Sequence, residues 1–140
     1  MARTHKYAGA SAQISTGLDP TEIAALCEAA AKSSETIQAL IRLEESKPGR
    51  LVYSIRNRVL GGRVEFMTFE VTMQPAGEGK RVRTRILTYK QKRQWILVIP
   101  LPWQMIAWNN YKRFMYALSE QISLRDSRAQ TNVVEIASAA

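Results

Sequence analysis

Three segments between Arg50 and Tyr89 alternate apolar and polar side chains, and glycine-containing turns (LGG, QPAGEGK) separate them. In the first of them, RLVYSIRNR, the side chains of Leu51, Tyr53 and Ile55 fall on one face of an extended chain. A period of two is typical of β-strands that bury one face, and such short turns join antiparallel neighbours. The sequence therefore predicts an antiparallel sheet whose apolar face needs a cover.

The two later segments carry further information about register. In RVEFMTFEVTM the apolar positions change parity at Phe66 and Met67, which predicts a bulge or burial on both faces. In KRVRTRILTYKQKRQ two faces alternate: Val82, Thr84, Ile86 and Thr88 share one, and Arg81, Arg83, Arg85, Leu87 and Tyr89 share the other.

Three more segments are expected to be strands. Residues 4–15 are rich in small side chains and form a weakly patterned first strand. Residues 35–45 (ETIQALIRLEE) also fit a helical stripe, but a strand is favoured because SKPGR then forms a hairpin turn into the next strand. The apolar run at 95–99 (WILVI) is expected to be a short strand that Pro100 and Pro102 terminate.

Two helices are predicted. Residues 17–34 contain Asp19 as an N-cap, Pro20 in the first turn and Glu22 at the capping-box spacing. From Trp103 to about Leu124, apolar residues recur every three or four positions, which indicates a long amphipathic helix. This helix is the expected cover of the sheet. The small, polar residues at 126–140 are expected to be a mobile tail after a single domain at 1–125.

Composition excludes several classes of protein. The single cysteine, Cys27, excludes an internal disulfide and CxxC metal sites, and a lone His5 adds no metal cluster, so neither a metal nor a cofactor is expected. The first residues lack the apolar core of a signal peptide, and no apolar run reaches about 18 residues, so a cytoplasmic protein without a transmembrane segment is expected.

The order of elements, together with the ending IPLPWQMIAWNNYKRFMYALSEQI, resembles the START-like (SRPBCC, helix-grip) superfamily over roughly residues 4–124. Two local features carry the resemblance. One is IPLP before a helix with the pattern Tyr111, Phe114, Ala117 and Leu118; the other is the pair of strands GGRVEFMTFEV and RVRTRILTYK, which is similar to small bacterial members. The resemblance implies an α+β fold in which a curved antiparallel sheet grips the C-terminal helix around a cavity. Members commonly bind hydrophobic molecules such as lipids or polyketides.

The predicted function is therefore non-catalytic binding of a hydrophobic small molecule between sheet and helix. The expected lining comes from the inward strand faces and the helical stripe: Tyr53, Ile55, Met67, Phe69, Ile86, Trp108, Tyr111 and Met115. The alternative for these residues is a packed core without a pocket. Tyr53 and Tyr111 are the most informative, because a buried phenol needs a hydrogen-bond partner. The sequence shows no triad, paired carboxylates or phosphate-binding loop that would favour an enzyme.

An alternative function is binding of nucleic acid or another anionic surface. The segment from Arg50 to Arg93 accounts for the whole net charge of +8. The candidate residues are Arg56, Arg58, Arg81, Arg83 and Arg85. A basic sheet face suits phosphates, although a solvated outer face of the sheet is the favoured explanation. Trp95 and Trp103 are expected to pack at a corner of the core, with a membrane or dimer contact as the alternative. The ligand and the oligomeric state stay open.

Overall fold

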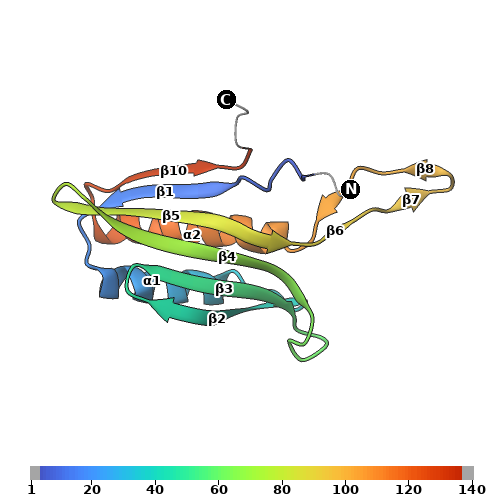
Figure 1. Ribbon diagram of the computed structural model, residues 1–140, viewed down its shortest axis with the longest axis horizontal. Helices are drawn as coiled ribbons and strands as arrows, with labels where there is room; N and C mark the ends of the chain where they lie inside the picture. The colour runs from blue at the N-terminus through green and yellow to red at the C-terminus, as the bar shows by residue number, and fades with distance from the viewer. Residues whose placement is uncertain (1–3, 137–140) are drawn as a thin grey trace.

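The computed structural model describes residues 4–136, whose main body is a six-stranded antiparallel sheet with two helices (Figure 1). The strand order is β10-β1-β5-β4-β3-β2. The strands are β1 (Ser11–Thr16), β2 (Ala39–Lys47), β3 (Arg50–Asn57), β4 (Glu65–Ala76), β5 (Gly79–Tyr89) and β10 (Gln130–Val134); the helices are α1 (Pro20–Ser33) and α2 (Trp108–Arg125). The predicted α+β class and antiparallel sheet are confirmed.

Helix α1 follows the sequence signals at its start. The side chain of Asp19 accepts a hydrogen bond from the backbone N–H of Glu22 at 2.9 Å, which satisfies one free donor of the first turn. One face of α1, including Ile23, Cys27 and Ala30, is buried. Burial raises the pKa of the Cys27 thiol to about 12, so this side chain is an apolar part of the core.

Strands β2 to β5 form the predicted meander, and the favoured strand at 35–45 is confirmed as β2. The parity change at Phe66 is a bulge, because Ile55 pairs with Met67 while Arg56 pairs with Glu65. A second bulge at Leu87 was not predicted: Thr68 pairs with Thr88 and Phe69 with Ile86. The extra residue reverses the parity of β5 beyond Ile86, so the predicted faces of Thr88 and Tyr89 are wrong.

Both helices cover the same face of the sheet, and the opposite face has no helix on it (Figure 1). Helix α2 begins at Trp108, five residues later than predicted, after Ala107 adopts a left-handed conformation with φ 68°. Its stripe of Tyr111, Phe114, Met115, Leu118 and Ile122 is fully buried. The predicted role of this helix as the cover of the sheet is confirmed.

The segment after α2 corrects the prediction of a mobile tail at 126–140. Residues Gln130–Val134 form the edge strand β10, which pairs with β1 in the register Ser11 to Val134. Asp126 fixes the connection, because its carboxylate accepts hydrogen bonds from the Thr16 hydroxyl at 2.7 Å and the Gly17 N–H at 2.9 Å. The sheet thus extends beyond the predicted domain limit at residue 125, and residues 137–140 lie outside the described part. The first strand is shorter than predicted, since residues 4–10 precede it without strand structure.

The segment between β5 and α2 also differs from the prediction. It folds into a narrow hairpin made of β6 (Gln91–Lys92), β7 (Trp95–Ile96), β8 (Ile99–Pro100) and β9 (Gln104–Met105). The hairpin projects beyond the end of the main sheet (Figure 1). Trp95 and Trp103 are exposed, so the preferred role for them in a corner of the core is wrong.

Candidate functional site

The eight residues predicted to line a ligand cavity lie on the inner side of the sheet and on α2. All except the half-buried Trp108 are buried. Aromatic rings fill the centre: the Phe69 ring lies 5.5 Å from Tyr53, 5.1 Å from Tyr111 and 4.8 Å from Phe114, measured between centroids. The predicted lining residues therefore contact one another, and they form the core of the fold.

The two buried phenols have different surroundings. The Tyr111 hydroxyl donates to the carbonyl of Ala10 at 2.9 Å and bonds the hydroxyl of Thr84 at 2.8 Å. The Tyr53 hydroxyl forms no hydrogen bond with any residue in the described part of the chain, although only 3% of the residue is exposed. Burial is the largest cause that raises the pKa of Tyr53, so its hydroxyl keeps its proton at neutral pH.

Tyr53 lines a groove of about 450 Å³ between α1 and the β2–β3 edge of the sheet. Small and aliphatic side chains form most of its walls: Ala24, Ala25, Ala31, Ile41, Leu43 and Leu51. Glu28 and Lys32, 3.6 Å apart, lie on its helical side. Mostly apolar walls with the hydroxyls of Tyr53 and Ser46 among them suit a small hydrophobic molecule that carries a polar group. The sequence analysis included Tyr53 but missed the rest of the groove, although Ile41 and Leu43 belong to the alternation of apolar residues that predicted β2.

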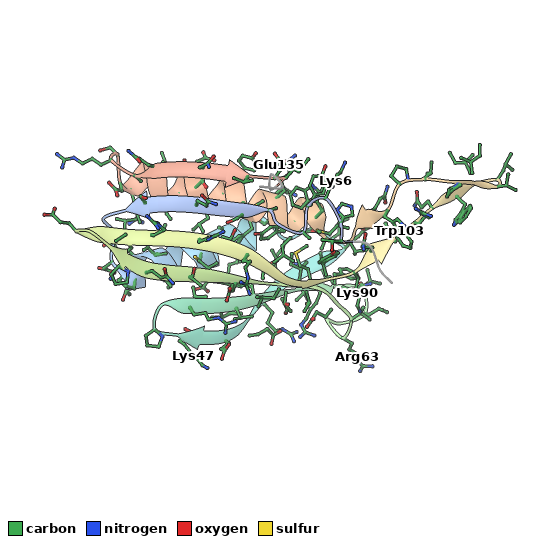
Figure 2. The ribbon with its side chains drawn as sticks, turned by 45° about the horizontal axis from the view of Figure 1, so that its top comes forward. Lys6, Lys47, Arg63, Lys90, Trp103 and Glu135 are labelled. Carbon is green, nitrogen blue, oxygen red and sulfur yellow. The ribbon has the colours of Figure 1, made fainter. Side chains whose placement is uncertain are left out.

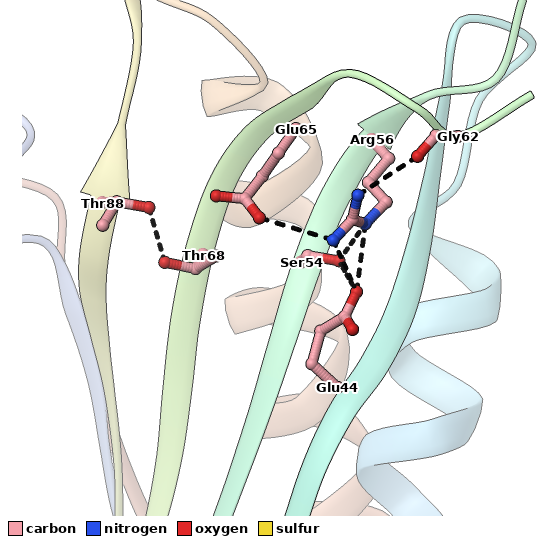
Figure 3. Close-up of polar contacts among 7 residues, drawn as sticks. All are labelled: Glu44, Ser54, Arg56, Gly62, Glu65, Thr68 and Thr88. Carbon is pink, nitrogen blue, oxygen red and sulfur yellow. Dashed lines mark hydrogen bonds and ion pairs between the residues drawn. The ribbon is translucent and has the colours of Figure 1, made fainter. Parts of the chain in front are cut away.

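The predicted basic residues divide into two groups, according to whether carboxylates within the fold pair with them. Arg56 lies 2.9 Å from Glu44 and 3.4 Å from Glu65, and it also bonds Ser54 and the carbonyl of Gly62 (Figure 3). Arg58 lies in the turn after β3, where it pairs with Glu35 at 3.4 Å. These two arginines are neutralised by carboxylates within the fold.

Arg81, Arg83 and Arg85 project together from β5, as predicted. Arg85 lies 3.4 Å from Glu70, which Arg50 also contacts at 2.6 Å. Arg81 and Arg83 form no ion pair with residues 4–136. They line a groove of about 450 Å³ over β1, β5 and β10, beside Gln13, Ser15, Gln130 and Asn132. The sequence analysis missed these polar neighbours, since Gln130 and Asn132 were assigned to a tail.

Within residues 4–136, no three His, Cys, Asp or Glu side chains are grouped as a metal site would require. None of the helices there has the length and apolar character needed to cross a bilayer. Comparison with protein-family models, with curated proteins and with solved structures finds no match for this chain.

Proposed function

We propose that the protein binds a hydrophobic small molecule, without catalysis, in the groove between α1 and the β2–β3 edge. The observation that carries the proposal is the Tyr53 hydroxyl, which lines an apolar groove and has no hydrogen-bond partner in the described chain. Because every fully buried polar side-chain atom of the described residues has a hydrogen-bond partner, the Tyr53 hydroxyl is open to the groove and free to donate to a ligand oxygen there. The START-like resemblance, with its lipid and polyketide ligands, agrees with this class of ligand.

The position of the groove differs from the cavity that the resemblance implies. A cavity between the sheet and α2 would occupy the volume that Phe69, Tyr111 and Phe114 fill. Helix α1 leaves the other edge of the sheet less covered, because alanines rather than large side chains face Leu43 and Tyr53. We therefore place the ligand beside α1.

Replacing Tyr53 with phenylalanine is expected to weaken ligand binding by about five- to tenfold, since one hydrogen bond is lost and the ring is kept. The measurement is native mass spectrometry of the purified protein before and after mild organic extraction. We expect the wild type to carry a small apolar mass that extraction removes, and the variant to carry much less of it.

Two control variants locate the effect. Tyr111→Phe breaks hydrogen bonds to Thr84 and Ala10 and is expected to lower stability without changing the bound mass. Ala24→Leu fills the groove and is expected to remove the bound mass from a protein that still folds. A wild type that carries no extractable mass, or a bound mass that survives both Tyr53→Phe and Ala24→Leu, contradicts the proposal.

A second function, binding of the nucleic-acid backbone, is favoured by Arg81 and Arg83, which line a polar groove and form no ion pair within residues 4–136. Exchange of both for glutamate is expected to abolish binding of a fluorescein-labelled single-stranded oligodeoxynucleotide in an anisotropy titration. Two phosphate contacts predict a salt dependence of log K with a slope of about −1.4 for the wild type. The matched control is Arg113→Glu with Arg125→Glu on α2, which changes the net charge equally. Equal losses in both double variants would indicate only a general charge effect.

A further inference from the structure

The hairpin at residues 94–103 exposes an apolar tip. Leu97 is 92% exposed and Val98 86%, and the flanking Ile96, Ile99 and Trp95 are each more than half exposed. No charged residue occurs between Arg93 and Lys112. Soluble proteins rarely leave such a continuous apolar surface in water unless it contacts a partner or a membrane. The tip has the composition of a contact surface.

The conformation of the turn supports a role outside the fold. Leu97 has φ 56°, in a region where glycine or asparagine is strongly preferred in two-residue hairpin turns. A leucine there is strained, and its exposed side chain gains no packing in the described chain. The residues best suited to folding this hairpin are thus absent from its tip, which an external apolar contact explains.

The hairpin is held in a fixed place at its base. The N–H of Leu101 donates to the carbonyl of Gln94 at 2.8 Å, and the N–H of Ile106 donates to that of Lys90 at 2.9 Å. An imidazole nitrogen of His5 lies 3.0 Å from the carbonyl oxygen of Trp103. The backbone N–H of His5 also donates to the Tyr89 hydroxyl at 3.0 Å. These contacts attach the projecting tip to the N-terminal segment and to β5.

Cationic residues surround this base. Lys90, Lys92 and Arg93 are exposed where the hairpin leaves the body, and the exposed Lys6 lies at the same end of the molecule (Figure 2). The Arg93 guanidinium lies 4.6 Å from the centroid of the Trp103 ring. Apolar tip, tryptophans and cations thus follow one another from the tip toward the body. This is the order of the acyl region, the interface and the phosphates in one leaflet of an anionic bilayer.

A second exposed apolar segment lies at the same end. The turn between β3 and β4 carries the exposed Val59 and Leu60, which line a groove together with Lys92 and Trp108. Figure 1 shows this turn at the end of the sheet from which the hairpin projects. A partner that contacts the hairpin therefore also meets this turn and the cations at the base of the hairpin.

We propose that the hairpin at residues 94–103 inserts its apolar tip into one leaflet of an anionic lipid bilayer, with Lys90, Lys92 and Arg93 at the phosphates. A strand rises about 3.3 Å per residue, so the tip reaches roughly 7 Å beyond Trp95. Interfacial segments bury their apolar side about 5–10 Å deep, so this length fits insertion without spanning. The site is separate from the groove at Tyr53 and does not depend on it.

The test uses co-sedimentation with vesicles of 30% phosphatidylglycerol and 70% phosphatidylcholine. The key variant is Leu97→Gly with Val98→Asn, because only the first turn residue, Leu97, has a positive φ, and glycine is preferred at that position of a type II′ hairpin turn. This change keeps the hairpin while removing the apolar tip. We expect the partition coefficient of this variant to fall by about tenfold or more, with an unchanged unfolding midpoint. Arg81→Glu with Arg83→Glu, on the helix-free face, is expected to keep most of the binding.

Tryptophan fluorescence gives a second measurement that needs no change at the tip. Brominated lipids are expected to quench the wild type, and a Trp95→Phe, Trp103→Phe variant is expected to lose this quenching. The remaining Trp108 reports on the body, since it stacks on Tyr7 with centroids 4.0 Å apart. The proposal is overturned if the wild type stays in the supernatant at low salt, or if quenching is equal with and without Trp95 and Trp103. It is also overturned if light scattering shows that the tip pairs two copies of the chain instead.

Discussion

Replacing Phe69 with alanine is expected to lower the free energy of unfolding by about 3–5 kcal/mol, the largest effect of any single core truncation here. Phe69 is fully buried on β4, and its ring contacts the rings of Tyr53, Tyr111 and Phe114. These partners come from β3 and from α2, so the cavity left by the truncation lies where the sheet meets its covering helix. Urea denaturation followed by circular dichroism measures the loss.

The control for this variant is Phe66→Ala on the same strand. Phe66 is the extra residue of the bulge and is only half-buried, so we expect a loss of about 1 kcal/mol. Equal losses at Phe69 and Phe66 would show that the aromatic cluster does not dominate the stability of the core.

Replacing Thr84 with valine is expected to lower the free energy of unfolding by about 2–4 kcal/mol, although the side chain keeps its shape. The Thr84 hydroxyl oxygen accepts the N–H of Ala12 at 2.8 Å and bonds the Tyr111 hydroxyl at 2.8 Å. The backbone pairing of β1 with β5 starts only at Gln13, so this hydroxyl replaces a ladder bond. Valine leaves the buried Ala12 N–H without an acceptor. Denaturation gives the magnitude, and faster hydrogen exchange at the Ala12 amide gives the location.

Thr88→Val is the matched control on the same strand. Thr88 is exposed on the helix-free face, where its hydroxyl lies 2.6 Å from that of Thr68 (Figure 3). Water replaces this bond when it is lost, so the expected change stays within about 0.5 kcal/mol. A similar loss at both threonines would mean that strand propensity, and not the buried hydrogen bonds, controls the effect.

The strands and helices with one buried face were predictable, because burial imposes a period on the sequence. Tyr53 and Ile55 alternate in β3, and Asp19 begins α1, as the pattern indicated. The bulge at Phe66 was also predictable from the change in parity. The bulge at Leu87 gave no such signal, because the sequence on both sides of it fits a single uninterrupted alternation.

Two elements, strand β10 and the projecting hairpin, were missed because neither buries an apolar face that would leave a periodic pattern in the sequence. Strand β10 pairs through its backbone with β1, and its residues Gln130, Thr131 and Asn132 are exposed, so they read as a polar tail. The hairpin tip has the opposite problem: residues such as Leu97 and Val98 have the composition of a core but have nothing packed over them. Apolar composition predicts that a surface favours contact, but not whether the chain itself supplies that contact.

The candidate sites were likewise predictable where a local pattern defines them, and not where contacts between distant elements define them. Arg81, Arg83 and Arg85 were predictable as a group, since alternate residues of a strand share a face. Which of them forms an ion pair depends on Glu70, which lies on the neighbouring strand β4 directly opposite Arg85. The groove beside Tyr53 depends on α1 and β2, whose distance from each other no local pattern encodes.

The pairing of β1 with β10 sets an order of assembly during synthesis. Strands β2 to β5 are joined by short turns and can pair as soon as they are made, and β1 can then add to β5. The other edge of β1 stays open until α2 and residues up to Val134 have been translated, because Ser11 pairs with that distant residue. An open strand edge can recruit other chains, and contacts this far apart in sequence form slowly. We expect nascent chains that stop after α2 to be the species most prone to aggregate.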